Sequence, residues 1–216
     1  LPCAGICSNM GFWSDDLSTA EILELYNQGP TYDPRSDTGN YASSATLTNF
    51  WLMDDKEVVV DRVGSKNLTV IGDPPMFLSP ESRLGKSAVG DFNLKRRGVS
   101  VLNFYPVPTT ANIFALSEPS PAFYPSFANG GSFSCFYRLL QKGEYSSIFI
   151  NDAYGSGNQH RHAVYLHPSN YVQLELGDGA SARANPNTSG TITDSDWHHF
   201  AYTVDYGGGS TTTIKL

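Results

Sequence analysis

Alternation of apolar and polar residues is clearest near the end of the chain. From residue 197 to 205 the two kinds alternate, so that Phe200, Tyr202 and Val204 would form one apolar row, because successive side chains of a strand point to opposite faces. Glycines and then a β-branched run follow over 207–216. Two strand-like runs joined by a glycine turn predict a β-hairpin.

Short strand-like runs recur through most of the remaining sequence. They are rich in β-branched and aromatic residues and lie at 50–53, 58–60, 68–71, 99–105, 132–140, 145–150, 163–166 and 171–176. Strands at intervals of roughly ten residues predict a β-sandwich. The length of 216 residues fits one large all-β domain or two small ones.

One segment near the start of the chain predicts a helix. Ser18 and Glu21 form a capping-box pattern. Ile22, Leu25 and Tyr26 follow at helical spacing and would share one face. A glycine followed by a proline then ends the helix.

Three motifs carry a family resemblance through their order. In the first motif, Gly-Phe-Trp at 11–13 precedes Leu-Ser-Thr-Ala-Glu-Ile and Leu-Tyr-Asn-Gln-Gly within 17–29. In the second, a Trp-containing strand precedes Asn-Leu-Thr-Val at 67–70. The third is Trp-His-His-Phe-Ala-Tyr-Thr-Val-Asp at 197–205. They resemble, in turn, the ending, the opening and the middle of laminin G-like domains of the concanavalin A-like superfamily. The resemblance implies an all-β, two-sheet antiparallel jelly-roll sandwich with one short helix near the N-terminus.

The resemblance also divides the chain into three parts. Residues 1–29 correspond to the closing strand and helix of such a domain, 30–48 to a polar linker, and 49–216 to the jelly-roll body. The linker is long for a loop within a compact domain, which predicts a boundary or an exposed arm. Residues 1–29 would close a previous repeat in a tandem array, a neighbouring subunit or, by circular permutation, the body of the same chain.

Composition restricts the class of partner. The formal net charge is -7, from 21 acidic and 14 basic residues, whereas nucleic-acid binding requires a basic stripe. We therefore expect no nucleic-acid partner, while divalent cations are compatible with this charge. No apolar run approaches the roughly 20 residues of a membrane span, so we expect no membrane insertion.

The sequence predicts no enzyme and no catalytic residues. Glycosidases of the jelly-roll superfamily place two close carboxylates on one strand, typically as Glu-x-Asp-x-x-Glu, and no glutamate here completes that pattern. The chain also has no Gly-x-Ser-x-Gly elbow. A divergent polysaccharide hydrolase is the weakest of the functional alternatives.

Carbohydrate binding typically uses an exposed aromatic platform with polar neighbours. The residues that offer such a surface are Tyr154, Asn158, His160, Tyr165 and Tyr171. Most aromatic residues of the chain must nevertheless lie in the core, so each tyrosine has that alternative. The imidazole of His199 is expected, by resemblance, to pack or to form a hydrogen bond.

Calcium is the cofactor that the resemblance implies, at the rim of the sandwich. Asn151, Asp152 and Asp178 lie at predicted strand ends and carry the oxygen ligands that this ion prefers. The alternative, which we favour slightly, is that these residues only form turns.

Cysteines and sequons bear on the compartment. Cys3 and Cys7 are close enough in sequence to form a small-loop disulfide, whereas Cys135 is expected to be a buried apolar residue. Asn67 and Asn187 fit the N-glycosylation pattern. The sequons favour an extracellular setting.

These features predict a non-enzymatic extracellular recognition or adhesion module that binds carbohydrate on a glycan or glycoprotein partner, with calcium as the candidate cofactor. The protein would be secreted or lie on a cell or virion surface. The alternative is a structural subunit or tandem repeat of a fibre or surface layer. Identical subunits would then join head to tail by strand and helix exchange, because contacts that do not close build filaments.

Overall fold

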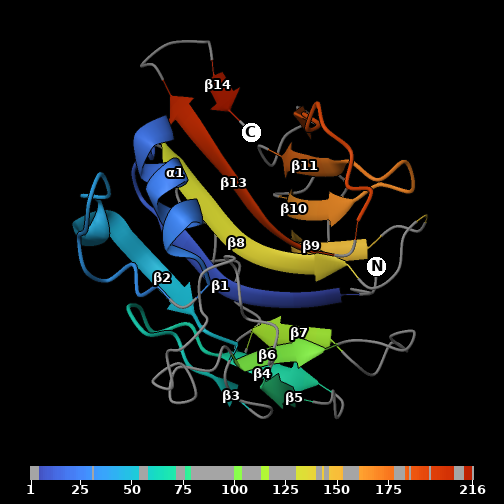
Figure 1. Cartoon of the computed structure of the whole chain (residues 1–216), viewed down its shortest axis with the longest axis horizontal. Coiled ribbons are helices and arrows are strands. Elements are labelled where there is room, and N and C mark those ends of the chain that lie inside the picture. The colour runs from blue at the N-terminus through green and yellow to red at the C-terminus, as the bar shows by residue number, and fades with distance from the viewer. Residues whose placement is uncertain are drawn as a thin grey trace, which may run out of the picture.

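The computed structural model describes most of the elements that the sequence predicts. It covers residues 5–30, 32–53, 58–71, 76–78, 100–103, 113–116, 130–139, 143, 146–152, 161–177, 183–184, 186–194, 196–206 and 212–215. The described part consists mostly of antiparallel strands with one α-helix (Figure 1). The expected all-β class is therefore confirmed.

The elements follow one another as β1 (Gly5–Trp13), α1 (Thr19–Gln28), a 3-10 turn η1 (Ser44–Thr46), β2 (Leu47–Trp51), β3 (Val58–Val59), β4 (Leu68–Ile71), β5 (Met76–Leu78), β6 (Ser100–Asn103), β7 (Ile113–Leu116), β8 (Gly131–Leu139), β9 (Ser146–Asp152), β10 (Arg161–Leu166), β11 (Val172–Gly177), β12 (Arg183–Ala184), β13 (Trp197–Tyr206) and β14 (Thr212–Lys215).

The largest sheet has the strand order β14-β13-β8-β1-β6-β5, and β2 also pairs with β1. Figure 1 shows the long strands β13, β8 and β1 side by side. β1 thus lies inside the sheet of its own chain, with β8 on one side and β2 and β6 on the other. In this single chain the N-terminal segment therefore pairs with its own body.

Two smaller sheets accompany it in the described part of the chain. One has the order β12-β11-β10-β9 and the other the order β3-β4-β7. Apolar residues of the three sheets meet in one core, where Phe12, Phe133 and Tyr202 of the largest sheet join Leu174 of β11 and Leu68 of β4. Burial of this shared apolar area is the main force that holds the sheets together.

The alternation predicted in β13 is confirmed. Phe200, Tyr202 and Val204 are 4%, 0% and 1% exposed and belong to the main core. On the opposite face of the sheet, Ser134 of β8 and Ala201 of β13 are small. Small side chains leave room for α1, which crosses this face in Figure 1.

The predicted helix is also confirmed. Ser18 caps α1, and its hydroxyl and the Glu21 carboxylate form the reciprocal capping box. Gly29 ends the helix at φ 75°, in the left-handed region that glycine enters without strain. Leu25 packs into a second apolar cluster with Trp13, Leu17, Tyr41, Leu47 and Phe50, on the face of the sheet opposite the main core.

The segment between α1 and β2 is more tightly packed than its polar composition suggests. Although 30–48 was expected to be a linker, Tyr41 is only 1% exposed. Its hydroxyl accepts a hydrogen bond of 3.0 Å from Trp13 Nε1, and the Glu21 carboxylate accepts one from the Ser43 hydroxyl. Residues 32–46 therefore form a strap that holds α1 against the sheet.

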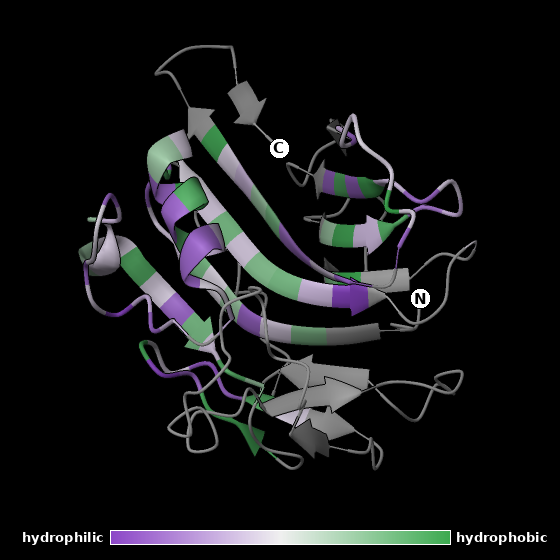
Figure 2. Cartoon of the chain, in the orientation of Figure 1, coloured by the Kyte–Doolittle hydropathy of each residue, from purple (hydrophilic) through white to green (hydrophobic). Residues whose placement is uncertain are grey.

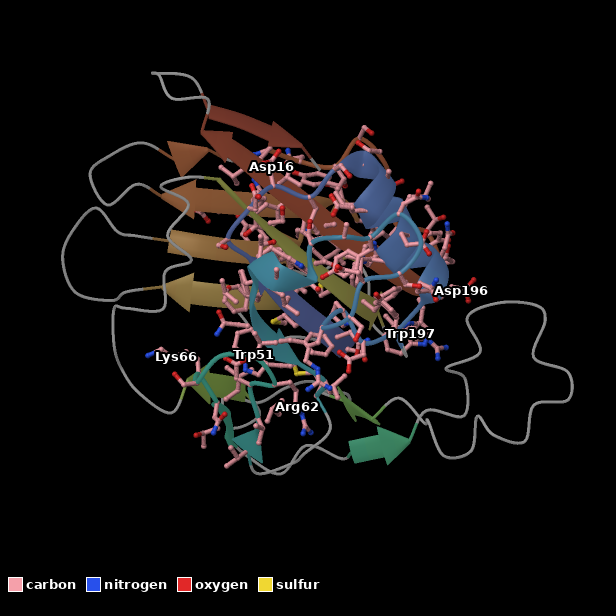
Figure 3. All side chains as sticks on the ribbon, turned by 90° about the vertical axis from the view of Figure 1, so that its left-hand side faces the viewer. Asp16, Trp51, Arg62, Lys66, Asp196 and Trp197 are labelled. Atoms are coloured by element: carbon pink, nitrogen blue, oxygen red, sulfur yellow. The ribbon has the colours of Figure 1, made fainter. Side chains whose placement is uncertain are left out.

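A buried carboxylate organises the loop between β3 and β4. Asp61 is 6% exposed and accepts hydrogen bonds from the backbone N–H groups of Phe50, Val63, Gly64 and Lys66 and from Asn49 Nδ2. Trp51 Nε1 donates to the Lys66 carbonyl at 2.8 Å, and Figure 3 shows the two residues side by side. Because N–H donors surround the Asp61 carboxylate, it acts as a structural anchor and not as a cation ligand.

Candidate functional site

The hairpin of β10 and β11 presents two stacked rings at its turn. Asn170 N–H donates to the His167 carbonyl at 2.7 Å, and His167 N–H donates to the Tyr171 carbonyl at 2.9 Å. Asn170 adopts φ 66°, as expected for the last residue of a three-residue hairpin loop. His167 and Tyr171 therefore leave the turn on the same side, with ring centroids 4.3 Å apart and planes 8° from parallel.

The two faces of this hairpin differ in chemistry. Val164, Leu166, Val172 and Leu174 point into the main core. Residues alternate faces along a strand, so Tyr165, Gln173 and Glu175 share the other face with the two stacked rings. Figure 2 shows the alternation as hydrophobic and hydrophilic bands along β11.

A further segment extends this face. Leu174 N–H donates to the Pro186 carbonyl at 3.0 Å, and Thr188 N–H donates to the Val172 carbonyl at 2.9 Å. Asn187 thereby forms an antiparallel bridge with Gln173, and directly opposed residues project to the same face. We call the surface formed by Tyr165, His167, Tyr171, Gln173, Glu175 and Asn187 the hairpin face.

The hairpin face is open near its turn and closed further along the strands. Tyr165 and Glu175 are 9% and 5% exposed, and the Tyr165 hydroxyl donates to Glu175 Oε2 at 3.4 Å. Tyr171 and Gln173 are half-buried, whereas Asn187 is exposed. The open part can bind a ligand that has both an apolar surface, for the rings, and hydroxyl groups, for the two side-chain amides.

The predicted glycan-binding residues are brought together only in part. Tyr165 and Tyr171 share the hairpin face, but the burial of Tyr165 excludes it from an exposed platform and makes it a support. Tyr154, Asn158 and His160 lie outside the described residues.

Sequence reasoning missed four members of this surface. His167, Gln173 and Glu175 could have been found once the hairpin was assigned, because every second residue of a strand lies on the same face. Asn187 was noted only as a sequon, because nothing in the sequence indicates that it lies beside Gln173.

Two of the predicted calcium residues, Asn151 and Asp152, lie at the end of this sheet away from the turn. Asn151 and Asp152 end β9, where they pair with the first residues of β10. β9 and β11 run in the same direction on either side of β10, so their ends lie about 10 Å apart at one end of the sheet. Asp178 follows β11 but is not itself described. Within the described ranges no group of three or more His, Cys, Asp or Glu side chains could hold a metal ion, so the calcium site stays a prediction.

A second polar pair lies beneath α1. Ser134 Oγ and His199 Nε2 are 2.6 Å apart, and His199 packs on Phe136 with ring centroids 4.6 Å apart. Burial lowers the pKa of His199 to about 4, which leaves the imidazole neutral at neutral pH. The expectation that His199 packs and forms a hydrogen bond is confirmed.

The Ser134–His199 pair has the composition of an activated nucleophile and its base. Ser134 also lines a small hollow together with Asn9 of β1 and Tyr32 of the strap. However, Ser134 is only 4% exposed, and α1 and the strap cover this face of the sheet. We therefore interpret the pair as a tie between β8 and β13.

The remaining predicted sites concern cysteine and asparagine. Cys135 is fully buried in the main core, as expected. Cys7 is 4% exposed, but Cys3 lies outside the described residues, so their disulfide stays a prediction. Asn67 is half-buried, and its Oδ1 accepts a hydrogen bond of 3.0 Å from the Asp61 backbone.

Compared with known protein families, with curated proteins and with solved structures, the chain matches none of them. In the part of the chain that is described, no helix has the length and apolar character needed to cross a membrane. The function must therefore be inferred from the residues of the site.

Proposed function

We propose that this protein is a non-enzymatic carbohydrate-recognition module that binds sugar on the open part of the hairpin face. The observation that carries the proposal is the stacked pair of His167 and Tyr171 beside the amides of Gln173 and Asn187. A sugar ring presents apolar C–H groups on its faces and hydroxyl groups at its edge. The aromatic rings can pack against the C–H groups, and the side-chain amides can form hydrogen bonds with the hydroxyl groups.

The hairpin face is preorganised for such a ligand. The backbone hydrogen bonds of the turn and the ring stack fix His167 and Tyr171 before binding. The bridge between β11 and the 186–188 segment holds Gln173 and Asn187 as direct neighbours, with Cβ atoms about 5 Å apart. Ordering costs on binding are then small, so more of the contact energy contributes to affinity.

The fold supports the proposal at a coarser level. Antiparallel sheets around one core, together with the order of the three motifs, are compatible with a laminin G-like jelly roll. We accordingly propose an extracellular or surface-exposed protein whose partner is a glycan or glycoprotein. We assign calcium to Asn151, Asp152 and Asp178. The first two of these residues end β9, at the end of the sheet away from the stacked rings.

The test uses an array of defined glycans in buffer that contains calcium, followed by titration calorimetry with the glycan that gives the strongest signal. We expect Tyr171→Ala to lower the affinity at least tenfold, which corresponds to about 1.4 kcal/mol. Tyr26→Ala is the matched control, because Tyr26 is 52% exposed on α1, which covers a different sheet. The proposal fails if the array gives no signal, or if a folded Tyr171→Ala variant binds like the unmodified protein.

The calcium assignment has its own measurement. We expect a chelator to weaken sugar binding and added calcium to restore it, and we expect Asp152→Asn to weaken calcium binding in a direct titration. Sugar binding that is unchanged in chelator, with no heat of calcium binding, would remove calcium from the proposal and leave the hairpin face in place.

A second candidate function is that of a structural subunit, in which β1 would be exchanged between copies. β1 supplies an inner strand of the largest sheet, so residues 5–30 of one copy would fit the same place in another and join copies head to tail. Native mass measured over a range of concentrations tests this candidate. Stable large assemblies would support it, and a monomer at every concentration would rule it out.

A further inference from the structure

Asn187 combines two properties that no other residue of the hairpin face has. It is exposed beside Gln173, and it begins the sequon Asn187-Thr188-Ser189. Thr188 Oγ1 accepts from Val172 N–H at 3.1 Å and donates to the Gly190 carbonyl at 3.0 Å. The sequon is thus fixed to the edge of β11, with Asn187 and Ser189 open to solvent.

We propose that N-glycosylation of Asn187 closes the hairpin face, so that the modified protein does not bind the sugar that the unmodified protein binds. The inference rests on the proposed function and adds its regulation. A glycan at Asn187 is bulky, and it would start directly opposite Gln173. Tyr171 is diagonal to Asn187 across the same pair of strands, about 7–8 Å away between Cα atoms. The first sugars of the attached chain therefore occupy the space above both residues.

The modification requires a lipid-linked oligosaccharide pyrophosphate as the donor. A bond forms between Nδ2 of Asn187 and C1 of the oligosaccharide, and the bond from C1 to the pyrophosphate oxygen breaks. The amide loses one proton, and the lipid pyrophosphate leaves. The exposed side chain of Asn187 can present its nitrogen to such a donor.

The other sequon differs in its surroundings. Asn67 is half-buried, and its Oδ1 is bound to the Asp61 backbone. Thr69, the third residue of that sequon, lies in β4 between β3 and β7. Asn67 is also not part of the hairpin face, so its modification would not close the site.

The experiment compares protein secreted from a host that adds N-glycans with protein from a bacterium that does not. Glycopeptide mass spectrometry reports the occupancy of Asn187, and the array of defined glycans reports binding. We expect occupied Asn187 to lower the array signal at least tenfold. Ser189→Ala removes the sequon while keeping Asn187, so the variant from the glycosylating host should bind like the bacterial protein. Thr69→Ala removes the other sequon, so this variant from the glycosylating host should still show the lowered array signal.

The outcomes separate this inference from the proposed function. Bacterial protein that binds no glycan on the array would overturn the proposed function and the inference with it. If the bacterial protein binds, the proposed function stands and two results would overturn the inference alone. One is that Asn187 stays unmodified in the secreted protein, and the other is that the glycosylated form binds the sugar equally well. Loss of binding that Ser189→Ala reverses would support both.

Discussion

Replacement of Asp61 by asparagine isolates the contribution of one buried charge to the stability of the fold. The two side chains have nearly the same shape, so Asp61→Asn leaves no cavity. In the folded protein, Oδ1 accepts from three backbone N–H groups, at 3.0, 3.2 and 2.9 Å. Oδ2 accepts from Asn49 Nδ2 at 2.6 Å and from Lys66 N–H at 3.1 Å.

In Asp61→Asn the amide oxygen can keep the three bonds of Oδ1, and the NH2 group then faces two donors. Asn49 can rotate its amide and offer an oxygen, whereas the backbone N–H of Lys66 cannot turn away. One hydrogen bond to a charged group is worth about 1.5–3 kcal/mol, and an unsatisfied buried donor costs about 1–3 kcal/mol. These two figures describe overlapping parts of the same loss, so we expect the free energy of unfolding to fall by about 2–4 kcal/mol.

Urea unfolding followed by tryptophan fluorescence measures the effect. With an m-value of roughly 2–3 kcal/mol/M, the midpoint should fall by about 1 M at unchanged m. Asp196→Asn is the matched control, because Asp196 is exposed and such substitutions stay within about 0.5 kcal/mol. An Asp61→Asn midpoint within about 0.2 M of the unmodified protein would refute the anchoring role.

Four other substitutions, one of them a control, test further contacts. Gly64→Ala should destabilise the protein, because a Cβ there would lie 2.6 Å from a carboxylate oxygen and 2.8 Å from a backbone carbonyl oxygen. Gly190→Ala is its control and should be nearly neutral in the same urea assay, because a Cβ at that position meets nothing within 4 Å. Tyr41→Phe should cost about 1–3 kcal/mol in thermal or urea unfolding, since it leaves the buried Trp13 N–H without its acceptor. Burial holds the pKa of His199 at about 4 in the folded protein, below its ordinary value of 6.5. The unfolded state therefore binds more protons between these two values, and stability falls as the pH drops from about 6.5 to 4. His199→Gln should reduce this pH dependence, and an unchanged slope would contradict the role of burial.

Local patterns were enough to predict several parts of the fold. The apolar row of β13 follows from alternation, and α1 follows from the capping box at Ser18. Both depend on residues within a few positions of one another, where the chain geometry leaves few choices.

The strap and the hairpin face could not be predicted in the same way. Tyr41 lies in a polar stretch, and its burial depends on Trp13, 28 positions away. Gln173 and Asn187 become neighbours only through the pairing register of β11 with the 186–188 segment. Such long-range registers are set by the packing of the whole sheet, so a single sequence does not determine them.

The most direct test of carbohydrate binding through the hairpin face is to map a bound glycan by NMR. The glycan with the strongest array signal would be titrated into isotope-labelled protein while backbone amide shifts are followed. We expect the largest changes at the backbone amides of residues 167, 169–173 and 187–189. Changes confined to α1 and the strap, or no changes at saturating glycan, would contradict the proposed site.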